Sequence, residues 1–277
     1  MRVHYLNGGS CSHLLAAVDG RTLRKVVFHA VFLAIEHSDL GWVVVDTGYG
    51  NRFFAATARW PYRLYRWVTP VTLRDTAAAA LAQLGVDASH VRHLVITHFH
   101  ADHIGGLREF PRARVYYHED ALRPLRSLSP FRQTRAAFLP ALVPDDLAKR
   151  SEILRGDSFR PDDELPFATA ILFGDARLKA VALPGHASGQ IGLLYTGDDG
   201  VRTLYCADAF WRSIQIEQDV DLPWIARKLQ WDAAAYSRTI SGLRGLARRR
   251  SHRLLACHDE VTHQFVTCDR QLSDARR

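Results

Sequence analysis

The sequence predicts an α/β fold in which two β-sheets pack face to face and helices cover their outer faces, an αββα sandwich. Short apolar runs rich in β-branched residues recur along the chain, as expected of buried strands. Helical stretches separate these runs into two groups, which indicates two βα halves packed sheet to sheet. With 277 residues, 47% of them hydrophobic, the chain is large enough to bury the core of one such sandwich.

The chain shows no sign of subdivision. No segment repeats with a period of 20 to 50 residues, and no linker separates two differently composed parts. We therefore expect a single domain over residues 1–277.

In the first half, strands alternate with short connections and two helices. We expect strands at 3–6, 14–18, 26–35, 42–46, 93–97 and 114–117, and helices at 75–84 and 118–125. The helix at 75–84 is alanine-rich and is stopped by Gly85.

Residues 51–71 combine basic and aromatic side chains, most densely from Arg59 to Trp67. We interpret this segment as a lid or substrate-channel element over a site. A membrane-interface patch, a nucleic-acid stacking surface and simple packing on the body of the protein are the alternatives.

In the second half, residues 127–165 contain four prolines, at 130, 140, 144 and 161, with short helical pieces between them. We interpret this range as an insertion that influences substrate choice, because variable loops carry specificity. Strands are expected at 168–173, 178–183, 191–195, 203–206 and 254–257, and an amphipathic helix at 232–248.

The composition restricts the classes of function. The formal net charge of +7 is compatible with nucleic acid, an anionic membrane or an acidic substrate. The basic run 248–253 ends a helical pattern, which favours a solvated helix end. The four cysteines, Cys11, Cys206, Cys257 and Cys268, show no C-x-x-C spacing, so we expect buried packing and no disulfides.

No stretch approaches the roughly 20 apolar residues of a membrane span. The first residues also lack the apolar core of a signal peptide, so cytoplasmic residence is the default expectation.

The most informative stretch of the chain is 97–106. Three histidines and an aspartate fall within six positions: His98, His100, Asp102 and His103. They follow a buried strand, and Gly105 and Gly106 permit close backbone approach beyond them. Imidazole nitrogens and carboxylate oxygens on a rigid strand-to-helix turn are well suited to bind a metal ion.

The pattern H-x-H-x-D-H resembles that of the metallo-β-lactamase superfamily. Three later segments have counterparts in that family in the same order: 184–186, 206–209 and 256–259, which contain His186, Asp208 and His258. His258 is preferred over His252 and His263 because it alone ends an apolar strand. The resemblance implies the αββα sandwich of the metallo-β-lactamase type.

The resemblance also implies a site with two divalent metal ions, zinc before iron or manganese. His98, His100 and His186 would hold the first ion, Asp102, His103 and His258 the second, and Asp208 would bridge them together with a hydroxide. Seven ligands exceed the needs of one tetrahedral zinc. Asp46, in an Asp-Thr-Gly turn, would lie beneath the metals without binding them, although a plain strand-ending turn is nearly as good an interpretation.

Such a site implies a hydrolase that uses the metal-bridging hydroxide on an ester, lactone or thioester carbonyl. Asp102 and Asp208 would be catalytic, with Asp102 passing a proton to the leaving group. A glyoxalase-II-like thioesterase, a phosphodiesterase and a metal-binding effector with vestigial activity are the alternatives.

The chain is similar to the N-acyl homoserine lactonase branch, with one departure. Where those enzymes carry a tyrosine three residues after the bridging aspartate, this chain has Trp211, a candidate substrate-binding residue. Tyr195 and Tyr205 are candidates to replace that tyrosine in space. We expect a small, hydrophobic or anionic substrate and no nucleic acid; the sequence does not indicate an oligomeric state.

Overall fold

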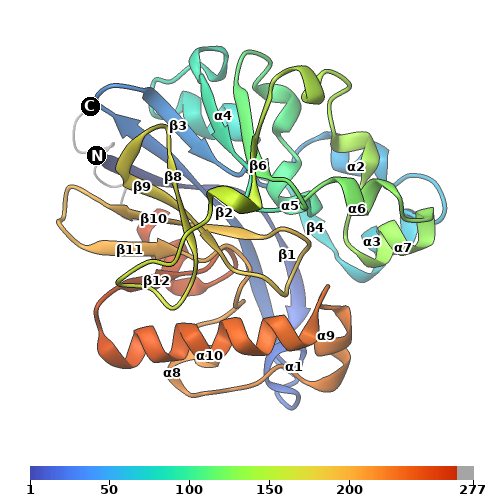
Figure 1. Ribbon diagram of the computed structural model, residues 1–277. Coiled ribbons are helices and arrows are strands. Elements are labelled where there is room, and N and C mark those ends of the chain that lie inside the picture. Colours follow the sequence, from blue (N-terminus) through green and yellow to red (C-terminus); the bar gives the residue numbers. More distant parts are fainter. Residues whose placement is uncertain (267–277) are drawn as a thin grey trace.

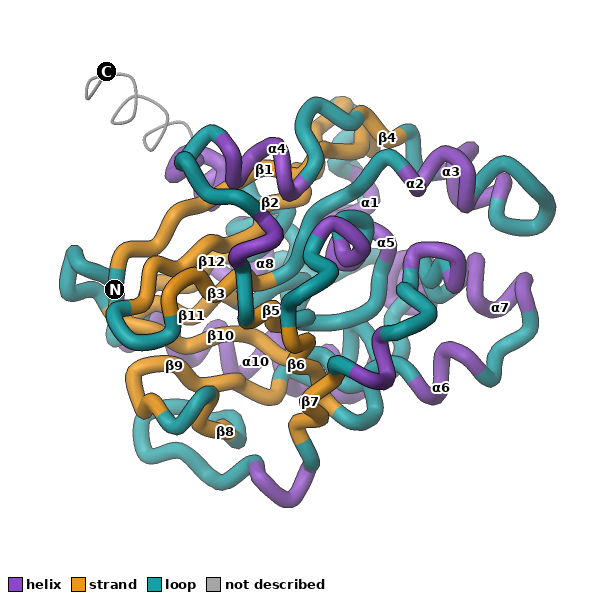
Figure 2. Tube along the Cα trace, turned by 90° about the horizontal axis from the view of Figure 1, so that it is seen from above, coloured by secondary structure: helices purple, strands orange, loops and turns teal. Residues whose placement is uncertain are grey.

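The computed structural model describes residues 1–266 and contains two mixed sheets that lie face to face, with helices on their outer faces (Figure 1). The predicted αββα sandwich is confirmed. Seen from above in Figure 2, the strands occupy the middle of the molecule and helices and loops surround them.

The larger sheet has seven strands, in the order β4 (Val71–Thr72), β1 (Arg2–Leu14), β2 (Lys25–His37), β3 (Gly41–Val45), β5 (His93–Val95), β6 (Arg114–His118) and β7 (Ser151–Leu154). The smaller sheet has five, in the order β12 (Arg253–Leu255), β11 (Arg202–Tyr205), β10 (Ile191–Thr196), β9 (Asp175–Ala182) and β8 (Thr169–Leu172). The helices are α1 (Ala16–Asp19), α2 (Arg52–Ala56), α3 (Arg63–Val68), α4 (Ala77–Ala82), α5 (Ala101–Ile104), α6 (Arg123–Arg126), α7 (Pro130–Arg135), α8 (Ile214–Glu217), α9 (Trp224–Leu229) and α10 (Ala233–Arg249).

Strand β2 shows how the layers are built. Its side chains alternate between two apolar clusters, because successive residues of a strand point to opposite faces. Phe32 and Ala34 pack in the cluster on the helix side, whereas Val31, Leu33 and Ile35 pack between the sheets. All five are at most 1% exposed, so this strand is buried on both faces and reads as a continuous apolar run.

Helix α10 covers the outer face of the smaller sheet. Its Leu243 and Leu246 pack in one cluster with Val181 of β9 and Leu204 of β11. The helix begins after Asp232, whose carboxylate accepts hydrogen bonds from two backbone N–H groups of the first turn.

Two predicted elements are wrong in part. Residues 14–18 are not a strand: β1 ends at Leu14, and α1 closes the tip of the β1–β2 hairpin before Gly20 in left-handed conformation. The helix expected at 118–125 is confined to α6, because His118 still belongs to β6 and a turn follows it. The first error lies where an apolar run continues past the last residue with a sheet partner.

Within 51–71 and 127–165 the structure has short elements. The first range holds α2 and α3, and the second holds α7 and β7. Strand β7 pairs in parallel with β6 and forms the edge of the larger sheet. The functions of these two ranges, lid and insertion, stay predictions.

The strand directions bring the predicted site residues to one edge. Strands β3 and β5 are parallel, as are β11 and β12, and β9 runs in the same direction as β11 because both are antiparallel to β10. The loops that leave the carboxyl ends of parallel strands gather at one edge of a sheet. The segments that follow these five strands therefore meet at the same end of the sandwich.

The loop 46–50 after β3 is tied closely to α5. Thr47 donates its N–H and its hydroxyl to the carbonyl of His103, and Gly105 donates its N–H to the carbonyl of Gly48. A side chain on Gly105 would lie 2.6 Å from the Gly48 carbonyl oxygen and would also strike the backbone of Gly50. Only glycine permits this approach, which sets the position of α5.

We predict that Gly105→Ala destabilises the protein by about 3 kcal/mol, because the clash is with backbone that has no room to move. The measurement is the free energy of unfolding in denaturant. Gly245→Ala is the matched control: an added methyl group there meets nothing within 4 Å, and it should stabilise α10 by about 0.5–1 kcal/mol. Equal stability of the two variants would contradict the close approach of loop and helix.

Candidate metal centre

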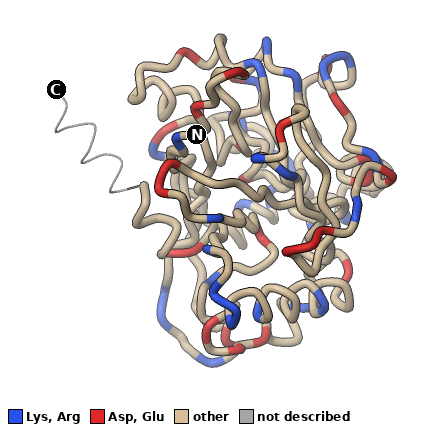
Figure 3. Tube along the Cα trace, turned by 60° about the vertical axis from the view of Figure 1, so that its left-hand side comes forward, with Lys and Arg blue, Asp and Glu red and all other residues tan. Residues whose placement is uncertain are grey.

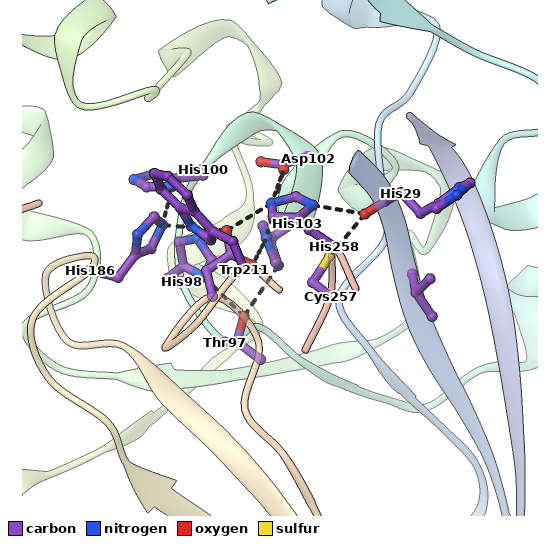
Figure 4. A network of polar contacts seen from close by, with 12 residues as sticks. His29, Thr97, His98, His100, Asp102, His103, His186, Trp211, Cys257 and His258 are labelled. Atoms are coloured by element: carbon purple, nitrogen blue, oxygen red, sulfur yellow. Dashed lines mark hydrogen bonds and ion pairs between the residues drawn. The ribbon is translucent and has the colours of Figure 1, made fainter. Parts of the chain in front are cut away.

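The end of the sandwich described above carries all seven predicted ligands, and Figure 4 labels all of them except Asp208. They come from four segments: the turn after β5, and the loops after β9, β11 and β12. His98 and His103 are fully buried, and the others are almost so, except His100, which is partly exposed.

A first group consists of His98, His100, His186 and Asp208, with one ligand atom from each lying within 4.8 Å of the others. The Nε2 atom of His186 lies 3.0 Å from Nδ1 of His100 and 3.4 Å from a carboxylate oxygen of Asp208. Three imidazoles and a carboxylate at this spacing match the donor set and size of a zinc site.

A second group shares Asp208 and adds His103, Cys257 and His258, again within 4.8 Å. The predicted ligand Asp102 lies beside this group, with a carboxylate oxygen 3.4 Å from Nε2 of His258 and 3.9 Å from Nε2 of His103. Cys257, expected to be a packing residue, is therefore also a candidate donor. The apolar residues before Cys257 predict a strand, but they do not indicate whether its thiol faces the site or the core.

Buried polar atoms without partners test whether this arrangement fits a metal. Nε2 of His98 is buried and has no hydrogen-bond partner among the described residues. Nε2 of His103 and Oδ1 of Asp208 are also buried without a hydrogen bond there, and they approach each other at 3.3 Å. Buried polar atoms normally have partners, and an absent ion is one cause of exceptions. Since these three atoms belong to the two groups, the residues present fit divalent metal binding.

Burial lowers the pKa values of His98, His100 and His186 below the ordinary imidazole value. Neighbouring imidazoles also lower all three pKa values, and the largest such effects come from His103 on His98 and from His186 on His100. The three imidazoles of the first group are thus neutral near pH 7, as metal-binding imidazoles must be.

The second group behaves differently. Burial opposes a charge on His103 and His258, but nearby carboxylates outweigh it and raise both pKa values. Asp46 and Asp208 act on His103, and Asp208 acts on His258. A metal that binds here displaces protons, so its affinity for the second group falls as the pH falls.

Neighbouring groups orient three of the imidazoles. Nδ1 of His103 lies 2.7 Å from Asp46, and Nδ1 of His186 lies 2.9 Å from the side-chain oxygen of Gln230. Nδ1 of His258 lies 2.7 Å from the backbone carbonyl of His29. With Nδ1 engaged, each ring presents Nε2 to the site, which is the usual arrangement around metal-binding histidines.

Of these partners only Asp46 has a recognisable sequence signal. It directly follows β3, and its carboxylate also accepts hydrogen bonds from the N–H and the hydroxyl of Thr97. Gln230 lies between α9 and α10, and no pattern in the sequence relates it to His186, 44 positions earlier.

The structure also shows where the aromatic candidates lie. Trp211 lies beside the first group, with its ring centre 5.9 Å from that of His186. Tyr195 and Tyr205 do not replace the lactonase tyrosine, because their hydroxyls bond Tyr5 and the Val31 carbonyl in the interior.

The two rival histidines belong to other surroundings. His252 lies near Glu164, and His263 stacks on His29. Cys11, Cys206 and Cys257 are buried free thiols, and Cys268 lies outside the described residues.

Comparison with known proteins decides the family. Residues 26–262 match the metallo-β-lactamase superfamily, which is most of the chain. The chain belongs to this superfamily. A probable metallo-hydrolase of Mycobacterium tuberculosis is 31% identical over 237 residues, which cover 82% of this chain and 68% of that protein.

Two further relatives have more specific names. The N-acyl homoserine lactonase AiiB of Agrobacterium fabrum is 25% identical over 81% of this chain and 77% of its own length. The acyl-coenzyme A thioesterase MBLAC2 of Bos taurus is 31% identical over 56% of this chain and 53% of its own length. Together with the metallo-hydrolases, these relatives support a metal-dependent hydrolase.

Among solved structures, an N-acyl homoserine lactone hydrolase with its product bound at the catalytic metal centre shares the fold of this chain. The TM-score is 0.69 at 15% identity, and the match covers 95% of both chains. Within residues 1–266, no helix has the length and apolar character needed to cross a membrane.

We predict that Asp46→Asn weakens metal binding 10- to 100-fold, as removing a carboxylate behind a metal-binding histidine typically does. Asn tolerates the left-handed backbone at this position (φ 62°), so the change is confined to the charge and to one misplaced N–H. Metal affinity is measured by competition with a chelator.

Asp175→Asn provides the matched control, since Asp175 also lies 2.7 Å from a histidine, His37, which is in neither ligand group. A similar loss of metal affinity in both variants would show that Asp46 has no special relation to the site.

Proposed function

We propose that the protein is a dinuclear-metal-dependent hydrolase that acts on an ester, lactone or thioester carbonyl. The observation that carries this proposal is the position of Asp208, whose carboxylate belongs to both ligand groups. A carboxylate shared by two ligand groups suits two metal ions held a few ångströms apart.

In this proposal each ion has three histidine or aspartate ligands of its own. The first group takes His98, His100 and His186, the second takes Asp102, His103 and His258, and Asp208 serves both. Zinc is favoured because imidazole nitrogens dominate the donor set, and iron and manganese are the alternatives. When bound, the two ions supply an activated water and a Lewis acid for the substrate carbonyl.

The residues of the chain have separate tasks around that chemistry. Asp208 lies 3.0 Å from Nε2 of His258, whose charge lowers the pKa of Asp208 against the opposing effect of burial, so the carboxylate is ionised and available as a shared ligand. Asp102, whose carboxylate lies 3.4 Å from Nε2 of His258, would pass a proton to the leaving group. Asp46 and Gln230 keep the rings of His103 and His186 in position.

Trp211 forms an apolar wall beside His186 and makes an edge-to-face contact with Phe28, with 6.4 Å between the ring centres. Its indole offers one N–H donor and no ionisable hydroxyl. This wall favours a substrate with a bulky hydrophobic acyl or aromatic group. A thioester is the second candidate, supported by the acyl-coenzyme A thioesterase among the relatives.

The substrate class is tested by supplying lactones, thioesters, esters and phosphodiesters to the metal-loaded protein with and without a chelator. We expect chelator-sensitive turnover of one of the carbonyl classes. Turnover of phosphodiesters alone would contradict the proposed substrate class, and no turnover with both ions bound would indicate a metal-binding effector.

We predict close to two divalent ions per chain, measured by elemental analysis of purified protein. His98→Ala combined with His100→Ala should remove activity and the ion of the first group, because two of its three imidazoles are lost. Two ions retained after Asp208→Ala combined with His258→Ala would show that Asp208 is not the shared ligand and would rule out the proposed arrangement.

A further prediction concerns Trp211. Short-chain homoserine lactones should be poor substrates compared with larger hydrophobic lactones or esters, since losing a hydrogen-bond donor to the developing oxyanion costs about 10²–10³ in rate. Trp211→Tyr should raise kcat/KM for homoserine lactones. Trp211→Phe is the control, because it keeps an aromatic ring and adds no hydroxyl; equal rates for the two variants would contradict this role.

A further inference from the structure

Three segments that border the metal centre expose an unusual number of large apolar side chains. The segments are 59–68, 130–136 and 224–231, and we call their surface the apolar-basic face. Each of these side chains belongs to a residue that is 44% to 66% exposed: Trp60, Trp67, Val68, Phe131, Trp224, Ile225, Leu229 and Trp231. Single exposed apolar residues are ordinary, whereas a contiguous set marks an interaction surface.

Printed contacts link the three segments into one surface. The rings of Trp60 and Phe131 meet edge to face at 5.5 Å. Phe131 and Arg135 are four residues apart along α7 and its end, so they share a side of that turn. Arg135 donates a hydrogen bond to the carbonyl of Lys228 at 2.9 Å, and the Lys228 ammonium lies 4.7 Å from the Trp224 ring centre.

The charge of this face has a single sign. The three segments contain seven basic residues and no acidic one: Arg59, Arg63, Arg66, Arg132, Arg135, Arg227 and Lys228, all exposed. Over the rest of the chain both acidic and basic residues occur (Figure 3), and the basic run 248–253 is the densest group of one sign there. Some of these cations lie over aromatic rings, as Arg63 does over Trp67 at 5.1 Å.

The face lies next to the site. Helix α9 continues into Gln230, which contacts His186, and Trp231 donates its N–H to the His186 carbonyl. Figure 1 shows α3, α7 and α9 on the same side of the molecule. A partner bound to this face would therefore lie close to the first ligand group.

We infer that the apolar-basic face docks the protein on an anionic phospholipid membrane. Tryptophan rings settle at the membrane interface, and aliphatic side chains such as Ile225, Leu229 and Val68 insert below the head groups. Each Lys or Arg near an anionic surface adds further attraction. This docking is peripheral and does not depend on the proposed hydrolysis.

Two other occupants fit less well. Nucleic acid would use the cations and the aromatic rings but has no place for the exposed aliphatic side chains, which do not stack on bases. A second copy of this chain would bring the same seven cations against each other, and like charges across an interface are repulsive. An anionic bilayer satisfies both the charge and the apolar side chains.

The experiment is flotation of the full-length, metal-loaded protein with vesicles, compared between phosphatidylglycerol–phosphatidylcholine mixtures and phosphatidylcholine alone. We expect binding to the anionic vesicles only, weakened when the salt is raised from about 0.1 M to about 1 M. Absence of binding to anionic vesicles at low salt would overturn the proposal.

Variants with matched controls locate the surface. Ile225→Ser should lower the partition coefficient about tenfold, because it removes an inserted apolar group. Ile171→Ser, at a similarly exposed isoleucine (56%) on β8, should leave it unchanged. Arg227→Gln combined with Lys228→Gln should lower it about 25-fold, about fivefold for each cation. Arg248→Gln combined with Arg249→Gln at the end of α10 serves as the charge control.

Two results would assign the face to another partner and overturn the proposal. Unchanged vesicle binding by Ile225→Ser, with the Arg227 and Lys228 variant weakened, would indicate a polyanion that uses charge alone. A dimer in lipid-free solution that Ile225→Ser dissociates, measured by sedimentation, would indicate a second copy of this chain.

Discussion

The carboxylate of Asp46 connects the parts of the structure on which the site depends. It receives hydrogen bonds from the backbone and side chain of Thr97 and lies 2.7 Å from Nδ1 of His103. Through these contacts the Asp46 carboxylate joins three elements: the residue after β3, the segment after β5, and helix α5. Burying an ionised carboxylate costs free energy unless hydrogen-bond donors surround it. The contacts of Asp46 therefore depend on all three elements keeping their relative positions.

Carboxylates also distinguish the imidazoles of the two ligand groups. Near Asp46 and Asp208 the imidazoles of His103 and His258 attract protons, whereas His98, His100 and His186 lose theirs through burial. The two ions of the proposed site therefore bind against different competition from protons. The charge of the carboxylates is compensated by protons before the metal enters and by the metal afterwards.

The sequence predicted the parts of this arrangement that rest on local pattern. The buried strands β2, β3 and β5 are long enough or apolar enough to be recognised from period and composition, and the residues after β5 are recognised from their spacing. The predicted strand at 14–18 is wrong because an apolar run in the sequence does not show whether a neighbouring strand is present to pair with it. Gln230 and Cys257 gave no signal, since their relation to the site depends on how distant segments pack.

The same reasoning connects the site with the surface around it. Gln230 is buried because Ala226 and His186 take up its amide, and this contact fixes α9 beside the first ligand group. The short helix then has one side committed to the protein, so Trp224, Ile225 and Leu229 can only face outward. Exposing these side chains in water costs free energy that a purely structural helix would avoid with polar residues. Their position beside the first ligand group, together with the positive charge around them, is explained most simply by a partner that is both apolar and anionic.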